Sequence, residues 1–200
     1  MQNKTKLRCL VLNQSYMPLS LFPLSVTTAE DAIHNYFGGS CDIVVAYDVP
    51  ILTPSRQDLY WPSVIANHNN HSFKKELRLR KELLYYRDHC VCMYCGRDLT
   101  IQTMTYDHVQ PRTKGGPHSW ENVVASCKDC NNAKSDEINP KKWRPRRIPW
   151  APNYYQMIDI RKKYPIYVDH ESWIDFLPKW DAPVIVGRPT RSETHLEHDS

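Results

Sequence analysis

The opening third of the chain alternates between short apolar runs and polar, turn-forming stretches. Residues 7–12 form an almost continuous apolar run, which predicts a buried β-strand. A threonine at position 27 or 28 can cap a helix that continues through Tyr36, because apolar side chains recur there at helical spacing. Residues 43–47 are rich in β-branched side chains and predict a second strand. We therefore expect a small α+β layer in this part of the chain.

The pattern changes after residue 50. Residues 53–72 are polar and contain two prolines, which predicts a loop. Basic and apolar side chains then alternate at helical spacing, which predicts a basic amphipathic helix over residues 74–88. Two prolines exclude a regular helix between residues 140 and 152. Further helices are expected near residues 153–163 and 170–177.

Composition narrows the class of protein. The chain has 200 residues, of which 41% are hydrophobic and 24% charged, an ordinary balance for a globular protein. No apolar run is long enough to predict a transmembrane helix. Shifts in composition divide the chain into four segments: an amino-terminal α+β region of unknown role (1–73), a basic helix followed by a cysteine-rich core (74–138), a proline- and aromatic-rich segment (139–186) and a disordered tail (187–200).

Seven cysteines are distributed unevenly along the chain, and five of them lie between residues 90 and 130. Four of these form two Cys-x-x-Cys pairs, Cys92 with Cys95 and Cys127 with Cys130. Each pair can hold one side of a tetrahedral ion, so the two pairs together predict a structural zinc site with four thiolate ligands. Such a site leaves no coordination position open, and we expect it to stabilise the fold without taking part in catalysis.

The other three cysteines lead to different expectations. Cys90, like His89, lies close enough to the first pair to be an alternative ligand. Cys9 and Cys41 are expected to be small apolar side chains of the core. A metal-binding cysteine pattern, together with an amino terminus that does not read as a secretory signal, is typical of a cytoplasmic protein.

A ββα arrangement is expected around the second cysteine pair. Residues 101–109 have the pattern of a strand, residues 122–125 that of a second strand that can pair with it, and residues 129–134 that of a short helix. Asp107 and His108 are unusual strand residues, and as sequence neighbours their side chains point to opposite faces. One of them can therefore bind a metal ion while the other approaches a substrate from a different direction.

The order of these residues resembles the HNH endonuclease family, whose core is a ββα-metal fold. The resemblance covers residues 87–136 and is carried by the two cysteine pairs and by Arg87-Asp88, Asp107-His108, Pro111-Arg112, Gly115-Gly116, Trp120-Glu121-Asn122 and Cys130-Asn131 with Lys134. It implies an α+β protein in which a ββα-metal core, held together by the zinc site, lies between α+β flanking regions.

The resemblance also implies a role for each residue of the motif. His108 corresponds to the general base that activates water, and Asp107 and Asn131 to the ligands of a catalytic Mg²⁺ or Mn²⁺ ion. Asn122 corresponds to the residue whose amide ties the loop and orients the base. Asn132, one position further along, is an alternative to Asn131. The implied reaction is hydrolysis of a phosphodiester bond to a 5′-phosphate and a 3′-hydroxyl.

Basic side chains in and around this motif predict contacts with backbone phosphates. The candidates for nucleic-acid binding are Arg78, Arg87, Arg112, Lys114, Lys134, Arg144, Arg146 and Arg147. A solvated surface is the alternative for the same side chains. His118 lies in the same loop and is expected to be exposed, whereas Trp143 and Trp150 are expected to pack in the core rather than stack on bases.

The sequence therefore predicts a metal-dependent endonuclease that acts on DNA, with double-stranded DNA as the expected form. RNA is the open alternative substrate, because a phosphodiester bond is attacked in either case. The alternative is a non-catalytic zinc-knuckle protein that only binds nucleic acid. Asp107, His108 and Asn131 favour the enzyme, because a binding module needs neither a base nor ligands for a hard ion. A thiol redox protein is a third hypothesis, which the pairing of the four cysteines disfavours. No membrane partner is expected, and both a monomer and a homodimer remain open.

Overall fold

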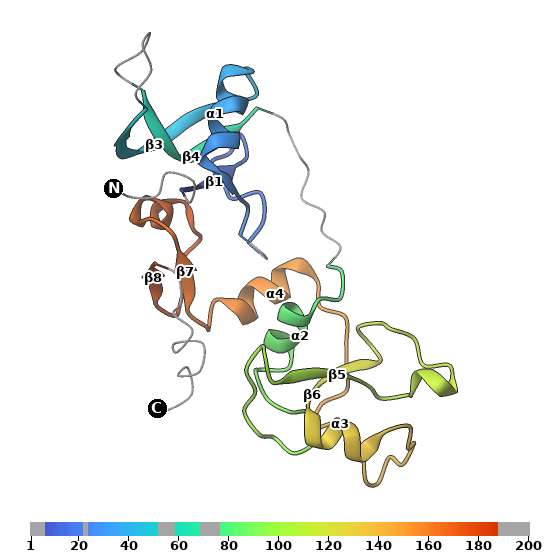
Figure 1. The fold of residues 1–200 in the computed structure, drawn as a ribbon. Coiled ribbons are helices and arrows are strands. Elements are labelled where there is room, and N and C mark those ends of the chain that lie inside the picture. Colours follow the sequence, from blue (N-terminus) through green and yellow to red (C-terminus); the bar gives the residue numbers. More distant parts are fainter. Residues whose placement is uncertain (1–6, 22–23, 52–58, 69–76, 188–200) are drawn as a thin grey trace. The chain divides into compact units, whose positions relative to one another are not determined.

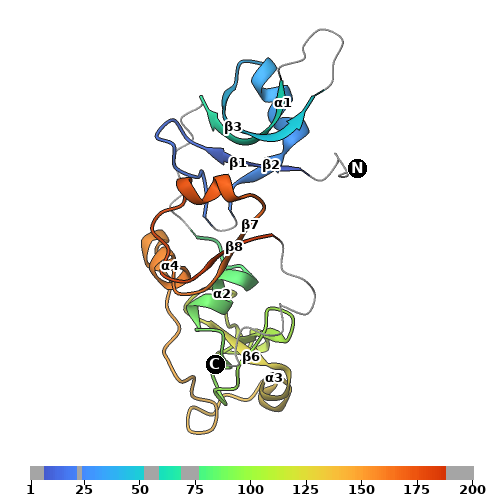
Figure 2. The same ribbon diagram turned by 90° about the vertical axis from the view of Figure 1, so that its left-hand side faces the viewer.

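The computed structural model describes residues 7–21, 24–51, 59–68 and 77–187 of the chain. These residues fold into two compact units. Unit 1 joins the described residues before position 74 to residues 163–187, and unit 2 consists of residues 77–162. The structure combines helices with β-sheets, which confirms the predicted α+β class (Figures 1 and 2). Of the tail predicted to be disordered, only Gly187 lies within the described residues.

Unit 1 is built on a four-stranded sheet with the strand order β2-β1-β4-β3. Its strands are β1 (Arg8–Leu12), β2 (Val26–Thr28), β3 (Cys41–Pro50) and β4 (Tyr60–Asn67). Strand β1 pairs antiparallel with β2 and parallel with β4, and β3 pairs antiparallel with β4. Helix α1 (Ala29–Phe37) follows β2 directly, because the Thr28 hydroxyl accepts a hydrogen bond from the Asp31 amide and caps the helix.

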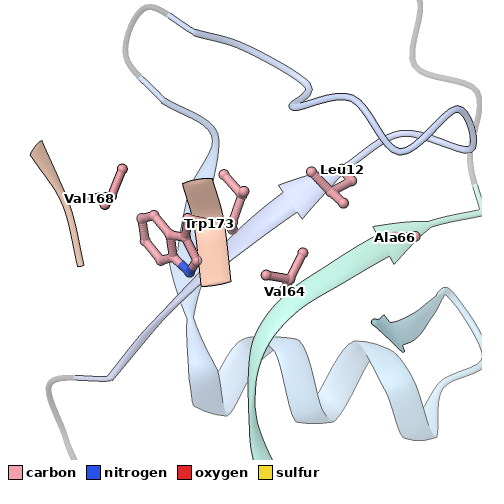
Figure 3. Packing of buried hydrophobic residues seen from close by; sticks show 6 residues of the cluster. Leu12, Val64, Ala66, Val168 and Trp173 are labelled. Atoms are coloured by element: carbon pink, nitrogen blue, oxygen red, sulfur yellow. The ribbon is translucent and has the colours of Figure 1, made fainter. Parts of the chain in front are cut away.

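Side chains of this sheet alternate between two faces, and a different element covers each face. One face packs on α1 through Cys9, Ala32, Cys41 and Ile65. The other face packs on the carboxy-terminal segment of the unit through Leu10, Leu12, Val64, Ala66, Val168 and Trp173 (Figure 3). Cys9 and Cys41 are therefore core residues, as the sequence predicts.

The carboxy-terminal segment of unit 1 contains strand β7 (Ile166–Val168), the 3₁₀-helix η3 (Glu171–Phe176) and strand β8 (Val184–Val186). Strands β7 and β8 pair in parallel. Trp173 fastens η3 to the sheet, because its buried indole N–H donates to the Ser63 carbonyl oxygen at 2.9 Å. The helix expected near residues 170–177 is thus a short 3₁₀-helix.

The prediction of a loop over residues 53–72 was wrong for strand β4. This strand lies between β1 and β3, and its residues 62–66 are buried. Pro62 suggested a loop because proline cannot donate to a strand ladder. In the structure Pro62 lies opposite Ala46, where the pairing of β3 and β4 is irregular and a missing N–H is tolerated.

Unit 2 contains a two-stranded antiparallel sheet of β5 (Met104–His108) and β6 (Val123–Cys127), followed by helix α3 (Lys128–Lys134). This is the expected ββα order, with the first strand shorter than predicted. Helix α4 (Tyr154–Arg161) begins at a capping box formed by Asn153 and Gln156, inside the predicted range. In the described parts of the chain no helix has the length and apolar character needed to cross a membrane.

The predicted basic helix over residues 74–88 is also corrected. Helix α2 spans only Lys81–Arg87, and residues 77–80 are not helical. Arg80 is extended (φ −131°, ψ 151°), so the helix begins after it without a side-chain cap. Residues 74–76 lie outside the described residues. Within the short helix the amphipathic prediction is confirmed, because its apolar residues Leu83 and Leu84 are buried.

Replacing Trp173 by alanine should destabilise unit 1 strongly. The change removes a buried indole and its hydrogen bond to Ser63, and truncation of a buried tryptophan costs about 3–5 kcal/mol. Urea unfolding followed by circular dichroism measures the loss. The control is Ile174→Ala at the next position, where the side chain is 40% exposed. A Trp173→Ala protein as stable as this control would contradict the packing in Figure 3.

Candidate metal centre and active site

The hairpin and α3 place the two cysteine pairs together. The ligand sulfur atoms of Cys92, Cys95, Cys127 and Cys130 all lie within 4.8 Å of one another. The Cys95 and Cys127 sulfur atoms are 3.9 Å apart. Tetrahedral zinc with bonds of about 2.3 Å requires sulfur atoms about 3.8 Å apart, so this cluster fits zinc. Cys90 and His89, the alternative ligands, are not part of the cluster in the described chain.

Backbone geometry favours the thiolate form of one member of this cluster, Cys92. Burial opposes ionisation of Cys92, but amide N–H groups of Cys127, Cys95 and Tyr94 outweigh it and lower the pKa of Cys92 to about 6. Burial and the neighbouring sulfur atoms raise the pKa of Cys130. Metal ions bind the thiolate form of cysteine, so a bound cation favours ionisation of all four groups.

The first cysteine pair is fixed against the rest of unit 2 by main-chain contacts. The Met93 amide donates to the Ala125 carbonyl of β6 at 2.9 Å, and the Arg146 amide donates to the Met93 carbonyl at 2.8 Å. Gly96 has a φ of +80° and lies directly under the Arg146 guanidinium, where a Cβ atom would collide with it. A residue larger than glycine is therefore strained immediately after Cys95, because a side chain rarely adopts this positive φ and the Arg146 guanidinium would also have to move.

A buried ion pair braces the same edge of β6. Arg87 is 2% exposed, and its guanidinium binds Asp88 at 2.8 Å and the Val123 carbonyl at 2.7 Å. The Asp88 carboxylate in turn accepts a hydrogen bond from the Ala125 amide at 2.7 Å. The prediction that Arg87 contacts a nucleic acid is corrected, because its charge is neutralised inside unit 2 and does not reach the surface.

Asp107 lies on β5 and is only 4% exposed. Its Oδ2 atom accepts a hydrogen bond from the Tyr94 hydroxyl. Burial, followed by this hydrogen bond, raises the pKa of Tyr94, so the phenol remains protonated and acts as the donor. The Nζ atom of Lys134 lies 3.1 Å from the same carboxylate. The Asp107 side chain is thus held from two sides, by the first cysteine pair and by α3.

Lys134 belongs to the interior of this site. It is 1% exposed, and its ammonium binds Asp107 and the His108 carbonyl oxygen, the latter at 2.8 Å. The predicted phosphate contact is therefore corrected for Lys134 as it is for Arg87. The position of a lysine in a motif does not show whether its ammonium faces solvent or a buried carboxylate. Spacing alone therefore cannot distinguish a phosphate contact from a buried ion pair.

His108 follows Asp107 and its ring is half-buried. The Nε2 atom of His108 lies 3.1 Å from Nδ1 of His118. Burial, with smaller contributions from His118 and Arg112, lowers the pKa of His108, so the ring is mostly neutral at pH 7 and can accept a proton. His118 is exposed, as expected, but its contact with His108 is a feature that the sequence analysis missed, because ten residues of loop separate the two.

Asn122 closes the loop between the strands. Its side-chain carbonyl accepts from the Gln110 amide at 2.9 Å, and its amide group donates to the Gln110 and Pro117 carbonyls at 3.1 and 2.8 Å. Gly116 lies so close that a Cβ atom there would overlap the Gln110 carbonyl oxygen. These bonds connect Asn122 to both ends of the loop segment between Gln110 and Pro117.

Asn131 on α3 lies beside β5. Its Nδ2 atom donates to Thr105 Oγ1 and to the Tyr106 carbonyl oxygen, both at 3.0 Å. These bonds place the Asn131 amide group against β5, beside the carbonyl of the residue that precedes Asp107. A carboxylate and an amide oxygen suit Mg²⁺ or Mn²⁺, so these residues fit a hard divalent ion. Asn132, the alternative, is exposed.

The remaining candidates for phosphate binding are at the surface of unit 2. The exposed ones are Arg78, Arg112, Lys114, Arg144, Arg146 and Arg147. Lys114 also donates to the Asp136 carbonyl at 2.7 Å, which ties the loop to the end of α3. Trp143 packs its ring on Tyr94 with centroids 5.6 Å apart, whereas Trp150 is 37% exposed.

Comparison with known proteins identifies this region. Residues 92–137 match the HNH endonuclease family. The chain contains an HNH endonuclease domain. The HNH domain extends from the first cysteine pair to just beyond α3, so it contains the four clustered cysteines and the pair formed by Asp107 and Lys134.

The HNH domain is related to parts of much larger proteins. CRISPR-associated endonuclease Cas9 of Corynebacterium diphtheriae is 39% identical over 51 residues, which are 25% of this chain and 5% of that protein. CRISPR-associated endonuclease Cas9 of Listeria innocua is 29% identical over 94 residues, which are 45% of this chain and 7% of that protein. The chain therefore corresponds to a small part of each of these relatives.

Replacing Cys127 by serine should unfold the HNH domain. Serine is a poor zinc ligand, and a structural zinc site supplies folding free energy directly. Zinc content per chain and the melting curve of the protein measure the effect. Cys9→Ala is the control, because Cys9 lies in unit 1 and should leave the zinc content unchanged. A Cys127→Ser protein that keeps its zinc and melts like the parent would contradict the four-cysteine assignment.

Proposed function

We propose that unit 2 is the catalytic part of a metal-dependent endonuclease that hydrolyses phosphodiester bonds of double-stranded DNA and leaves 5′-phosphate and 3′-hydroxyl ends. The proposal is supported by the HNH family match over residues 92–137 and by the hydrogen bond from Asn131 to the carbonyl of Tyr106, the residue before Asp107 and His108. The bond from Asn131 to the Tyr106 carbonyl brings the amide of α3 to the strand residue that precedes Asp107.

Each residue of the site has a proposed task. His108 takes the proton from the attacking water, and Asn122 holds the loop that follows His108. Asp107 and Asn131 hold a Mg²⁺ or Mn²⁺ ion, which when bound acts as a Lewis acid on the phosphate and on the departing 3′-oxygen. The cysteine cluster holds a structural zinc ion that keeps β6 and α3 in place.

The distribution of charge supports a nucleic acid as the substrate. Residues 77–162, which form unit 2, hold 16 of the 26 lysines and arginines but only 9 of the 22 acidic residues. Unit 2 is therefore basic, whereas the rest of the chain is not. Exposed arginines such as Arg112, Arg144 and Arg147 can neutralise backbone phosphates, which makes binding steeply dependent on salt.

One observation favours the alternative, a protein that binds nucleic acid without cleaving it. Asp107 already forms an ion pair with Lys134, at 3.1 Å, and this neighbouring positive charge weakens the attraction of the carboxylate for a cation. A carboxylate has about four lone-pair directions, so the contacts with Lys134 and Tyr94 still leave room for an ion. We therefore keep the endonuclease as the proposed function.

Cleavage of supercoiled plasmid by the purified full chain tests the proposal. We expect nicking with Mg²⁺ or Mn²⁺, none with EDTA, and a loss of about 100-fold or more in His108→Ala, because general base catalysis contributes about 10²–10⁴ in rate. DNA binding by His108→Ala should persist. The control is His34→Ala, an exposed histidine of α1. Binding without cleavage in either metal, across varied DNAs, would support the alternative.

A further inference from the structure

We propose that Tyr94 is a positioning residue that orients the Asp107 carboxylate toward the catalytic ion and so couples the cysteine cluster to the active site. This inference rests on the proposed function, because it assumes that Asp107 is a ligand of a divalent ion. It gives the cysteine cluster a role beyond fold stabilisation. The Tyr94 side chain would then connect the cysteine cluster to Asp107 on β5.

Tyr94 lies inside the first cysteine pair, between the two ligands Cys92 and Cys95. Any ion that fixes these two sulfur atoms also fixes the backbone from which the Tyr94 side chain extends. The hydroxyl of Tyr94 reaches across to β5 and donates to Oδ2 of Asp107. The position of the cysteine pair therefore sets the position of a hydrogen-bond donor on the carboxylate.

The Tyr94 ring has little freedom to move. Its edge-to-face contact with Trp143 has a centroid separation of 5.6 Å. Trp143 is itself held by the bond from its indole N–H to Glu137, at 2.7 Å. The next residue back, Met93, is bonded to β6 through its amide, at 2.9 Å from the Ala125 carbonyl oxygen. A donor held in this way can select one orientation of the carboxylate.

Lys134 also contacts this carboxylate, with Nζ 3.3 Å from Oδ1 and 3.1 Å from Oδ2. Lysine contributes charge, but its ammonium lies almost equally far from both oxygens and distinguishes them poorly. The Tyr94 hydroxyl contacts Oδ2 specifically. Oδ2 therefore accepts from both Tyr94 and Lys134, whereas Oδ1 contacts only Lys134 among these two residues. Oδ1 is thus the oxygen with more lone-pair capacity for an ion.

The test uses Tyr94→Phe, which keeps the ring on Trp143 and removes only the hydroxyl. Binding of Mn²⁺ to the zinc-loaded full chain is measured from the electron paramagnetic resonance signal of free Mn²⁺, with Asp107→Asn as the reference for loss of the site. We expect the Mn²⁺ affinity of Tyr94→Phe to fall on the order of 10-fold, the usual effect of losing a partner of a metal ligand. Zinc content should not change.

Nicking is measured in parallel. We expect Tyr94→Phe to need about 10-fold more Mn²⁺ for half-maximal nicking and to recover most of the parent rate at high Mn²⁺. The matched control is Tyr85→Phe, which removes another buried hydroxyl of unit 2, bonded to the Leu99 carbonyl at 2.8 Å. This control should lose stability without any change in Mn²⁺ affinity, which separates positioning from a general structural effect.

The Mn²⁺ affinities separate the role of Tyr94 from the existence of the ion site. Unchanged Mn²⁺ affinity in Tyr94→Phe, with a parent that binds Mn²⁺ better than Asp107→Asn, would overturn the inference and leave the proposed function standing. Equal weakening in Tyr94→Phe and Tyr85→Phe would also overturn it. A parent that binds Mn²⁺ no better than Asp107→Asn would overturn the proposed ion site itself, and the inference with it.

Discussion

The closure of four sulfur atoms around one point is the constraint on which unit 2 depends. The hairpin of β5 and β6 has only two strands, and a two-stranded sheet is marginal in water without further support. The cysteine cluster ties the loop before β5 to the junction of β6 and α3. The order of β5, β6 and α3 then brings an imidazole, a carboxylate and an amide into one small region.

Buried charge is the second organising feature of the unit. Ion pairs in a protein interior add little net stability, because desolvation of both groups offsets their attraction. Removing one partner is costly, so such pairs hold their neighbours in fixed positions. Arg87 with Asp88 holds the backbone of β6, and Lys134 with Asp107 holds the end of β5. Two residues that resemble phosphate ligands in the sequence are thus parts of the framework.

Sequence patterns predicted those features of the structure that depend only on residues close together in the chain. The Cys-x-x-Cys pairs and the Thr28 cap needed only neighbouring residues, and both appear as expected. Strand β4 could not be predicted, because its burial comes from β1 and β3, which are distant in sequence. The contacts of Tyr94 with Asp107 and of His108 with His118 also arise only when the chain folds. No periodic pattern in the sequence predicts them, because the partners are ten or more positions apart.

If the cysteine cluster assembles the active site, zinc content and nicking should change together. The direct measurement is stepwise removal of zinc with a chelator that prefers zinc to magnesium, with nicking assayed in excess Mg²⁺ at each step. We expect the nicking rate to fall in proportion to the zinc lost and to return when zinc is restored, because the cluster holds the site together. Full nicking activity in a zinc-free protein would contradict it.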